Sequence, residues 1–159
     1  MKKHMIRISS RLVEEAVVAD LHSPSKSELL GRLSVIAAHN YGLNADIVHD
    51  GLVERERLGP TGFGGGTAIP HCKVTGIDMP VAIFVRLAKP VEYNAVDDEP
   101  VDLVCALVSP AQDGASHLRA LAEISRLFRD EKFRTQLRGA ADGDAMFALL
   151  THIEERDAA

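Results

Sequence analysis

Apolar and polar residues follow each other with helical spacing in the first third of the chain. Ser25 and Glu28 stand three residues apart, as in a capping box, so a helix is expected to begin there and to end at Gly42. Its apolar positions are Leu29, Leu30, Leu33, Ile36 and Ala37. Asn44 can cap a second helix. That helix carries on one side the apolar residues Ile47, Val48 and Leu52.

Two apolar runs rich in β-branched residues follow, at positions 81–87 and 101–108. Each is bounded by prolines, which predicts two strands that pair in one buried sheet. Helical spacing then returns at Leu118, Leu121, Ile124, Leu127 and Phe128, and a last helix is marked by Met146, Phe147, Leu149, Leu150 and Ile153. We therefore expect an α/β fold, in which residues 1–159 form a single three-layer domain with a mixed β-sheet flanked by helices and a helical C-terminal third.

The charge balance narrows the possible functions. The net charge is -5, and 18 basic residues are scattered among 23 acidic ones, which disfavours a nucleic-acid or anionic-membrane partner. Charged residues interrupt the N-terminal segment before it could form a signal peptide, and no stretch approaches the roughly 20 apolar residues of a membrane span. Cys72 and Cys105 are too far apart to indicate a disulfide scaffold, so we expect reduced thiols in a cytoplasmic protein.

The segment 59–66 is the least ordinary part of the sequence, because five of its eight residues are glycine. Such a segment predicts positive φ angles or a close approach of the backbone to another group, and its amides can bind an anion. It contains neither of the familiar nucleotide-binding glycine patterns. Its composition alone fits a connecting loop as well as an anion site.

Pro70 and His71 follow this glycine-rich segment. Imidazole has an ordinary pKa of about 6.5, so a histidine is mostly neutral and nucleophilic at pH 7 and can accept a phosphoryl group. A purely structural role is the alternative. A metal site with Cys72 would need further ligands, and distant His117 is the one candidate, so no metal is expected.

The segment 55–71 resembles the active-site signature of fructose/mannitol-type enzyme IIA domains of the bacterial phosphotransferase system, and most of all their nitrogen-regulatory branch. The matching residues are Arg55, Glu56, Arg57, Leu58, Gly59, Thr61, Gly62, Gly64, Gly66, Ala68, Ile69, Pro70 and His71. The similarity continues through 100–103, 108–110 and 116–121, and covers about residues 16–150. Cys72 departs from the glycine that is common after the active histidine of that branch.

This resemblance implies that His71 is phosphorylated by an HPr-like phosphocarrier protein without a cofactor, with Nε2 as the acceptor atom. Arg55 would be the active-site arginine and His117 the second, non-phosphorylated histidine. The phosphate-binding loop would comprise Gly62, Gly64, Gly65, Gly66 and Thr67. We interpret Glu56 as a solvent-facing charge, and we expect the glycines to leave His71 little side-chain cover.

The nitrogen-regulatory reading is a freestanding phosphocarrier whose phosphorylation state controls its binding to target proteins. The alternative is a sugar-specific enzyme IIA that passes the phosphoryl group to a cysteine of a IIB subunit. A non-catalytic interaction module of the same fold is a further possibility. A metal-dependent hydrolase is disfavoured, because no paired carboxylates accompany the histidines.

Overall fold

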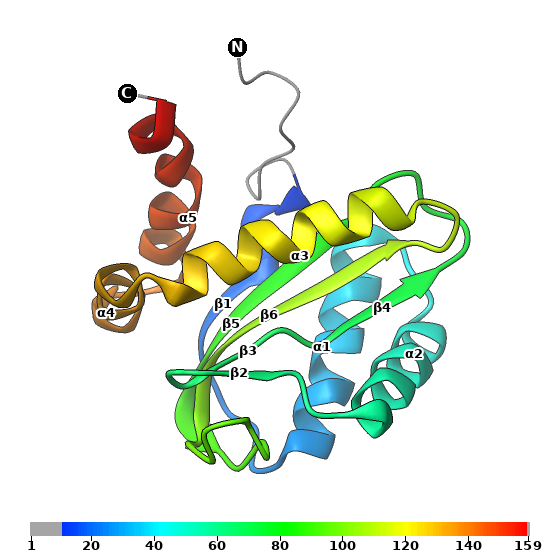
Figure 1. Cartoon of the computed structure of the whole chain (residues 1–159), viewed down its shortest axis with the longest axis horizontal. Helices are drawn as coiled ribbons and strands as arrows, with labels where there is room; N and C mark the ends of the chain where they lie inside the picture. The colour runs from blue at the N-terminus through cyan, green and yellow to red at the C-terminus, as the bar shows by residue number, and fades with distance from the viewer. Residues whose placement is uncertain (1–10, 159) are drawn as a thin grey trace.

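A mixed β-sheet forms the middle layer of the computed structural model, which describes residues 11–158 and the side chains of residues 11–152 (Figure 1). Its strand order is β1-β5-β6-β3-β2, and β4 pairs with the end of β6. Strands β5 and β6 are antiparallel, as are β2 and β3, whereas β1 is parallel to β5, and β3 and β4 are parallel to β6. The strands are β1 (Val17–Leu21), β2 (Gly62–Gly64), β3 (Thr67–Ala68), β4 (His71–Val74), β5 (Val81–Val91) and β6 (Val101–Pro110).

Helices α1 (Lys26–Tyr41) and α2 (Ala45–Leu58) cover one face of the sheet. Ser25 Oγ accepts a hydrogen bond from the Glu28 amide, and Asn44 Oδ1 accepts one from the Ile47 amide, so both predicted caps are confirmed. Gly42 ends α1 at a φ of 68°, in the left-handed conformation that glycine adopts most easily.

One predicted apolar position on α2 is wrong. Val48 and Leu52 are buried as expected, but Ile47 is 56% exposed. Residues four apart share a helix face, whereas adjacent residues point about 100° apart, so with Val48 and Leu52 facing the sheet Ile47 lies at the side of the buried stripe.

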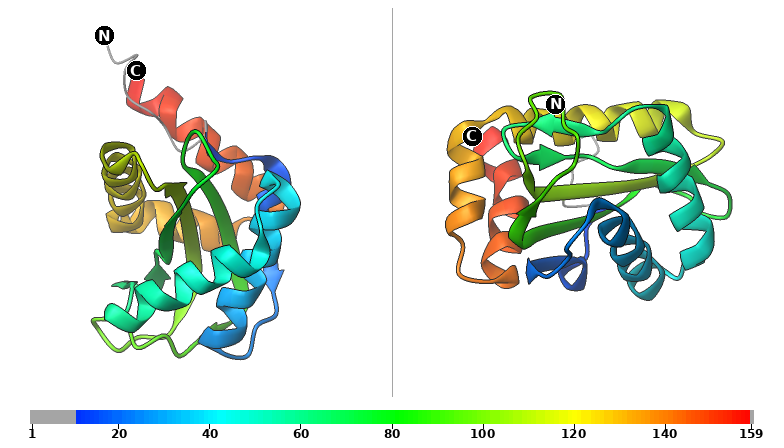
Figure 2. Two further views of the ribbon diagram at one scale, coloured as in Figure 1. Left: turned by 90° about the vertical axis from the view of Figure 1, so that its right-hand side faces the viewer. Right: turned by 90° about the horizontal axis from the view of Figure 1, so that it is seen from below.

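Helices α3 (Gly114–Arg129), α4 (Glu131–Gly139) and α5 (Gly143–Ala158) form the third layer, and Figure 2 shows α3 and α1 on opposite faces of the sheet. The fold class is therefore the predicted one. Ile124 and Phe128 are buried, but Leu118 is 67% exposed, contrary to expectation. Helix α4 was not separately predicted.

Some sequence predictions fall outside the described structure. They concern the segment 1–10, for which we excluded a signal peptide, and the side chain of Ile153. Across residues 11–158, each helix is too short or too polar to span a lipid bilayer.

Strand β2 lies within the glycine-rich segment and β3 directly follows it, and the sequence predicted neither strand. The turn between them passes through Gly64, Gly65 and Gly66, with φ angles of 106°, 64° and 78°. These angles lie where residues with a Cβ are strained, so the turn depends on glycine. The chain then enters β4, whose first residue, His71, pairs with Leu107 of β6.

Candidate functional site

His71 lies in a cavity of about 240 Å³ between the end of α2 and helix α3. Its Nδ1 is 2.8 Å from the carbonyl oxygen of Ile69. A carbonyl can only accept a hydrogen bond, so Nδ1 carries the proton of the neutral ring. Arg55 Nε donates to Nε2 at 3.2 Å. The unshared electron pair of His71 is therefore on Nε2 and points to Arg55.

Burial is the largest cause that lowers the pKa of His71 below its ordinary value. The positive charges of Arg55 and Lys73 lower the pKa further, whereas the hydrogen bond to Ile69 and the charge of Glu56 oppose the shift. His71 is thus neutral at pH 7. We expected little side-chain cover, but the residue is half-buried, because its pairing with β6 draws it between two helical layers.

Arg55 extends from the last turn of α2, and its Nη1 also donates to the Gly59 carbonyl at 2.9 Å. This second bond holds the guanidinium at the His71 ring. Arg57 points to solvent, where it pairs with Glu54 at 3.2 Å, with both side chains more than 60% exposed. Of these two neighbouring arginines, only Arg55 contacts His71.

His117 approaches His71 from the first turn of α3. The two ring centroids are 5.3 Å apart, with the planes inclined by 49°. The His117 ring is buried, and its Nδ1 lies 2.6 Å from the Ser109 hydroxyl at the end of β6. Burial, followed by the charges of His71 and Lys73, lowers the pKa of His117 to about 4. His117 is therefore also neutral at pH 7.

The interpretation of Glu56 as a solvent-facing charge is wrong, because its side chain is 6% exposed. It accepts hydrogen bonds from the Thr61 amide at 3.1 Å, from the Thr61 hydroxyl, and from the Tyr93 hydroxyl at 3.0 Å. Lys26 forms an ion pair with it at 2.8 Å. Glu56 thus anchors to α2 the segment that contains Gly59, whose carbonyl accepts the second hydrogen bond of Arg55. The sequence did not reveal this role, since Lys26 and Tyr93 are remote from Glu56 along the chain.

The predicted phosphate-binding loop divides between two places. Gly62 lines the His71 cavity, but Gly65 and Gly66 line a separate cavity of about 270 Å³. There Arg138 donates to the Gly65 carbonyl at 2.7 Å and pairs with Asp102. The structure therefore does not bring Gly65 or Gly66 to His71.

The other two members of the predicted loop make internal contacts. Thr67 is fully buried in β3, and its hydroxyl donates to the Gly64 carbonyl at 2.7 Å. The side chain of Thr67 thus stabilises the glycine turn itself.

Cys72 points to the opposite face of β4 from His71, as successive residues of a strand do. Its thiol is buried against α2, and burial raises its pKa to about 12. Within the described residues, no three histidine, cysteine or acidic side chains gather as metal ligands. The Cys72 side chain is a packing contact between β4 and α2.

This contact predicts that Gly51→Ala lowers the free energy of unfolding by about 1–3 kcal/mol. A Cβ at Gly51 of α2 would lie 2.9 Å from Cys72 Cβ, so the helix or the strand must shift. Gly31→Ala in α1 is the matched control, because nothing lies within 4 Å of its added Cβ. That variant should gain about 0.5–1 kcal/mol from helix propensity. Urea denaturation measures both changes, and equal stabilities of the two variants would contradict the packing argument.

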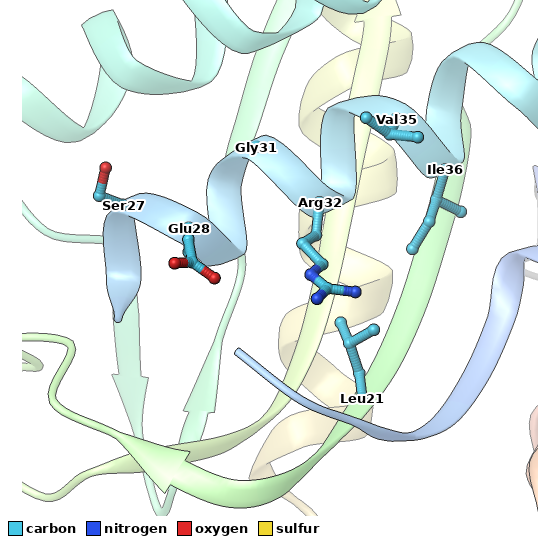
Figure 3. A pocket seen from close by; sticks show the side chains of 7 residues that line it. All are labelled: Leu21, Ser27, Glu28, Gly31, Arg32, Val35 and Ile36. Atoms are coloured by element: carbon cyan, nitrogen blue, oxygen red, sulfur yellow. The ribbon is translucent and has the colours of Figure 1, made fainter. Parts of the chain in front are cut away.

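A larger cavity of about 660 Å³ lies on α1, beside the end of β1 (Figure 3). Its lining combines apolar side chains with one acidic and one basic residue, at Leu21, Ser27, Glu28, Gly31, Arg32, Val35 and Ile36. It contains none of the histidines, so the candidate chemistry lies in the smaller cavity around His71.

The chain is similar to known proteins over nearly all of its length. It is 38% identical over 143 residues to the nitrogen regulatory protein of Bradyrhizobium diazoefficiens. The aligned region covers 90% of this chain and 94% of that protein. It is 33% identical over 150 residues to the nitrogen regulatory protein of Escherichia coli, with 94% and 92% covered. The crystal structure of nitrogen regulatory protein IIA-Ntr from Neisseria meningitidis matches with a TM-score of 0.84 at 29% identity, covering 90% of this chain and 98% of that one.

Residues 11–153 also match the pattern of the family described as "Phosphoenolpyruvate-dependent sugar phosphotransferase system, EIIA 2". That match includes every element that builds the His71 cavity, from α2 to α3. The chain belongs to the EIIA 2 family of the phosphoenolpyruvate-dependent sugar phosphotransferase system.

Proposed function

We propose that this chain is a nitrogen-type IIA phosphocarrier, a single domain that accepts a phosphoryl group on His71 Nε2 from the phosphohistidine of a small HPr-like carrier. The main support is the pair of hydrogen bonds on the His71 ring, which leaves the electron pair of Nε2 beside Arg55. Family membership makes the chain a phosphotransferase component. The names of its relatives support the nitrogen-regulatory branch.

The proposed reaction exchanges one phosphorus–nitrogen bond for another. Nε2 of His71 attacks phosphorus while the bond to the carrier's imidazole breaks, and that electron pair leaves with the carrier. The carrier ring keeps the proton on its other nitrogen and departs neutral. His71 likewise keeps its Nδ1 proton, held by the Ile69 carbonyl. Its ring therefore takes up the positive charge that the carrier's phosphorylated, protonated ring gives up. The reactants balance without a nucleotide, a metal or a proton transfer.

Arg55 has one role before phosphoryl transfer and another during it. Before transfer it donates to Nε2, and it must leave that atom for the phosphoryl oxygens as the new bond forms. Its bond to the Gly59 carbonyl keeps the guanidinium at the site during this shift. A guanidinium stabilises the negative charge gathered on the transferred group.

Two exposed leucines suit the docking of a protein donor. Leu58, 79% exposed, ends α2 three residues after Arg55, and Leu118, 67% exposed, follows His117 on α3. Exposed apolar side chains on the two helices that supply Arg55 and His117 suit contact with another protein. We assign both leucines to the carrier's docking surface.

The proposed output is a change of charge at this surface. The phosphoryl group carries about -1.5 to -2 charges, more than the one positive charge of the protonated ring can offset, so a target that docks there must pair or desolvate the phosphate. We place this exchange in the cytoplasm, a reducing compartment suited to the free thiols of Cys72 and Cys105.

Incubation with labelled phosphoenolpyruvate, a phosphotransferase enzyme I and an HPr-type carrier tests the proposal. We expect one acid-labile phosphate, which mass spectrometry at alkaline pH maps to His71 and ³¹P NMR assigns to Nε2. Absence of label would favour a non-catalytic module. Phosphate on another residue would overturn the assignment of His71. If the label then moves to the cysteine of an added IIB subunit as fast as it arrives, the sugar-specific alternative replaces the nitrogen-regulatory one.

A further inference from the structure

Ser109 lies near the end of β6, where it is fully buried and its hydroxyl contacts the His117 ring at Nδ1. The Ser109 hydroxyl and Nδ1 of His117 are 2.6 Å apart. Within the described structure, no other hydrogen bond reaches either atom. Ser109 has no role predicted from the sequence, although the stretch 108–110 that contains it resembles the IIA family.

The direction of this hydrogen bond follows from the needs of the hydroxyl group. If Nδ1–H of His117 donated to Ser109, the hydroxyl proton would be buried with no acceptor, at the cost of an unmade hydrogen bond. If the hydroxyl donates to Nδ1, both groups are satisfied. In that arrangement the proton of the neutral His117 ring must be on Nε2.

The choice of tautomer matters because the two histidine rings are only 5.3 Å apart, between centroids. Since Nδ1 is occupied by Ser109, Nε2 is the ring nitrogen of His117 left to meet a phosphoryl group on His71. Nε2–H would donate to a phosphoryl oxygen. In the other tautomer, Nε2 would carry an electron pair instead of a proton. Two hydrogen-bond acceptors would then face each other, which would disfavour transfer.

We infer that Ser109 is a positioning residue that holds His117 in the Nε2–H tautomer, so that His117 presents a hydrogen-bond donor to the phosphoryl group on His71. The use of this donor rests on the proposed function. The tautomer itself does not, because it is a property of the unphosphorylated protein.

Histidine ¹⁵N NMR of the unphosphorylated protein at pH 7 tests the tautomer directly. We expect His117 to show a protonated, pyrrole-type Nε2 and an unprotonated, pyridine-type Nδ1. In Ser109→Ala the two nitrogen shifts should move toward each other as the tautomers mix. A pyrrole-type Nδ1 in the wild-type protein, or unchanged shifts in Ser109→Ala, would overturn the inference.

The rate of His71 phosphorylation tests the use of the tautomer. Ser109→Ala should lower that rate by about 10-fold, the effect of one lost or reversed hydrogen bond. The same substitution in a His117→Ala background should cause no further loss, because Ser109 acts through His117. Independent, additive losses would overturn the positioning role.

Ser34→Ala is the matched control for removing a buried hydroxyl. Ser34 is 1% exposed and donates to the Leu30 carbonyl within α1, on the other side of the sheet. It should leave both the His117 shifts and the transfer rate unchanged. If the wild-type protein accepts no phosphate, the proposed function and the use of the donor fail together, whereas the NMR result on the tautomer stands by itself.

Discussion

Arg55→Ala should slow phosphorylation of His71 by about 10- to 1000-fold, or about 1–4 kcal/mol in barrier. The lost guanidinium contacts the attacking nitrogen itself, at 3.2 Å, and lies where the phosphoryl charge arrives. Arg55→Lys should recover only part of the rate. A lysine keeps the positive charge, but its donors share one nitrogen, whereas Arg55 uses Nε for His71 and Nη1 for the Gly59 carbonyl.

Rapid-quench measurement of label on His71 gives this rate, and His71→Ala gives the background of the assay.

The pH dependence of the phosphorylation rate is a second test of the role of Arg55. The Arg55 charge helps to lower the pKa of His71, so its removal should raise that pKa and move the acidic limb of the rate profile to higher pH. Arg57→Ala is the control, because Arg57 is exposed and pairs only with Glu54 among the described residues. Equal rates in Arg55→Ala and Arg57→Ala would refute the role of Arg55.

Helices α1 and α2 could be predicted from the sequence because the signals that mark their ends are local. Ser25 and Asn44 satisfy amides within their own first turns, and Gly42 needs only its own backbone conformation. The exposure of Ile47 and Leu118 could not be predicted. It depends on how far each helix rotates about its axis against the sheet, and both residues border a buried stripe.

The short strands β2 and β3, in and directly after the glycine-rich segment, could not be predicted either. Strand β3 has two residues, too few for an alternating pattern, and it is held by pairing with Leu103 and Val104 of distant β6. Glycine-rich β2 carries almost no side chains that could indicate which face is buried. A loop was therefore the expectation from local sequence.

The residues of the candidate site likewise differ in how far the sequence could reveal them. The segment that ends in Pro70 and His71 is continuous in sequence, so its resemblance to a family was enough to propose His71 as the nucleophile. Glu56 and Ser109 act through contacts with residues that are distant or unremarkable in sequence, namely Tyr93 and His117. A buried glutamate near an active-site arginine is indistinguishable from a solvated one until its partners are placed around it.

Glu56→Ala should lower the free energy of unfolding by about 2–4 kcal/mol, because it removes the acceptor shared by buried donors and one lysine. Tyr93 is fully buried and Thr61 nearly so. Their hydroxyl groups can still bond to each other at 3.0 Å, and Lys26, 25% exposed, can regain water. These compensations keep the loss below that of a fully buried, unpaired charge. Urea denaturation measures the change.

The same variant should also slow phosphorylation of His71, because the Thr61 amide would no longer tie the segment after Gly59 to α2 and the carbonyl anchor of Arg55 would loosen. Glu56→Gln keeps the shape and one acceptor oxygen, so its stability and rate should fall between those of the wild type and the alanine variant. Glu54→Ala is the matched control on the same helix. Glu54 is 65% exposed and pairs with exposed Arg57, and such a surface pair contributes about 0–1 kcal/mol. If Glu56→Ala and Glu54→Ala are equally stable, Glu56 does not fasten the segment, and the position of Arg55 must be fixed by its own two hydrogen bonds.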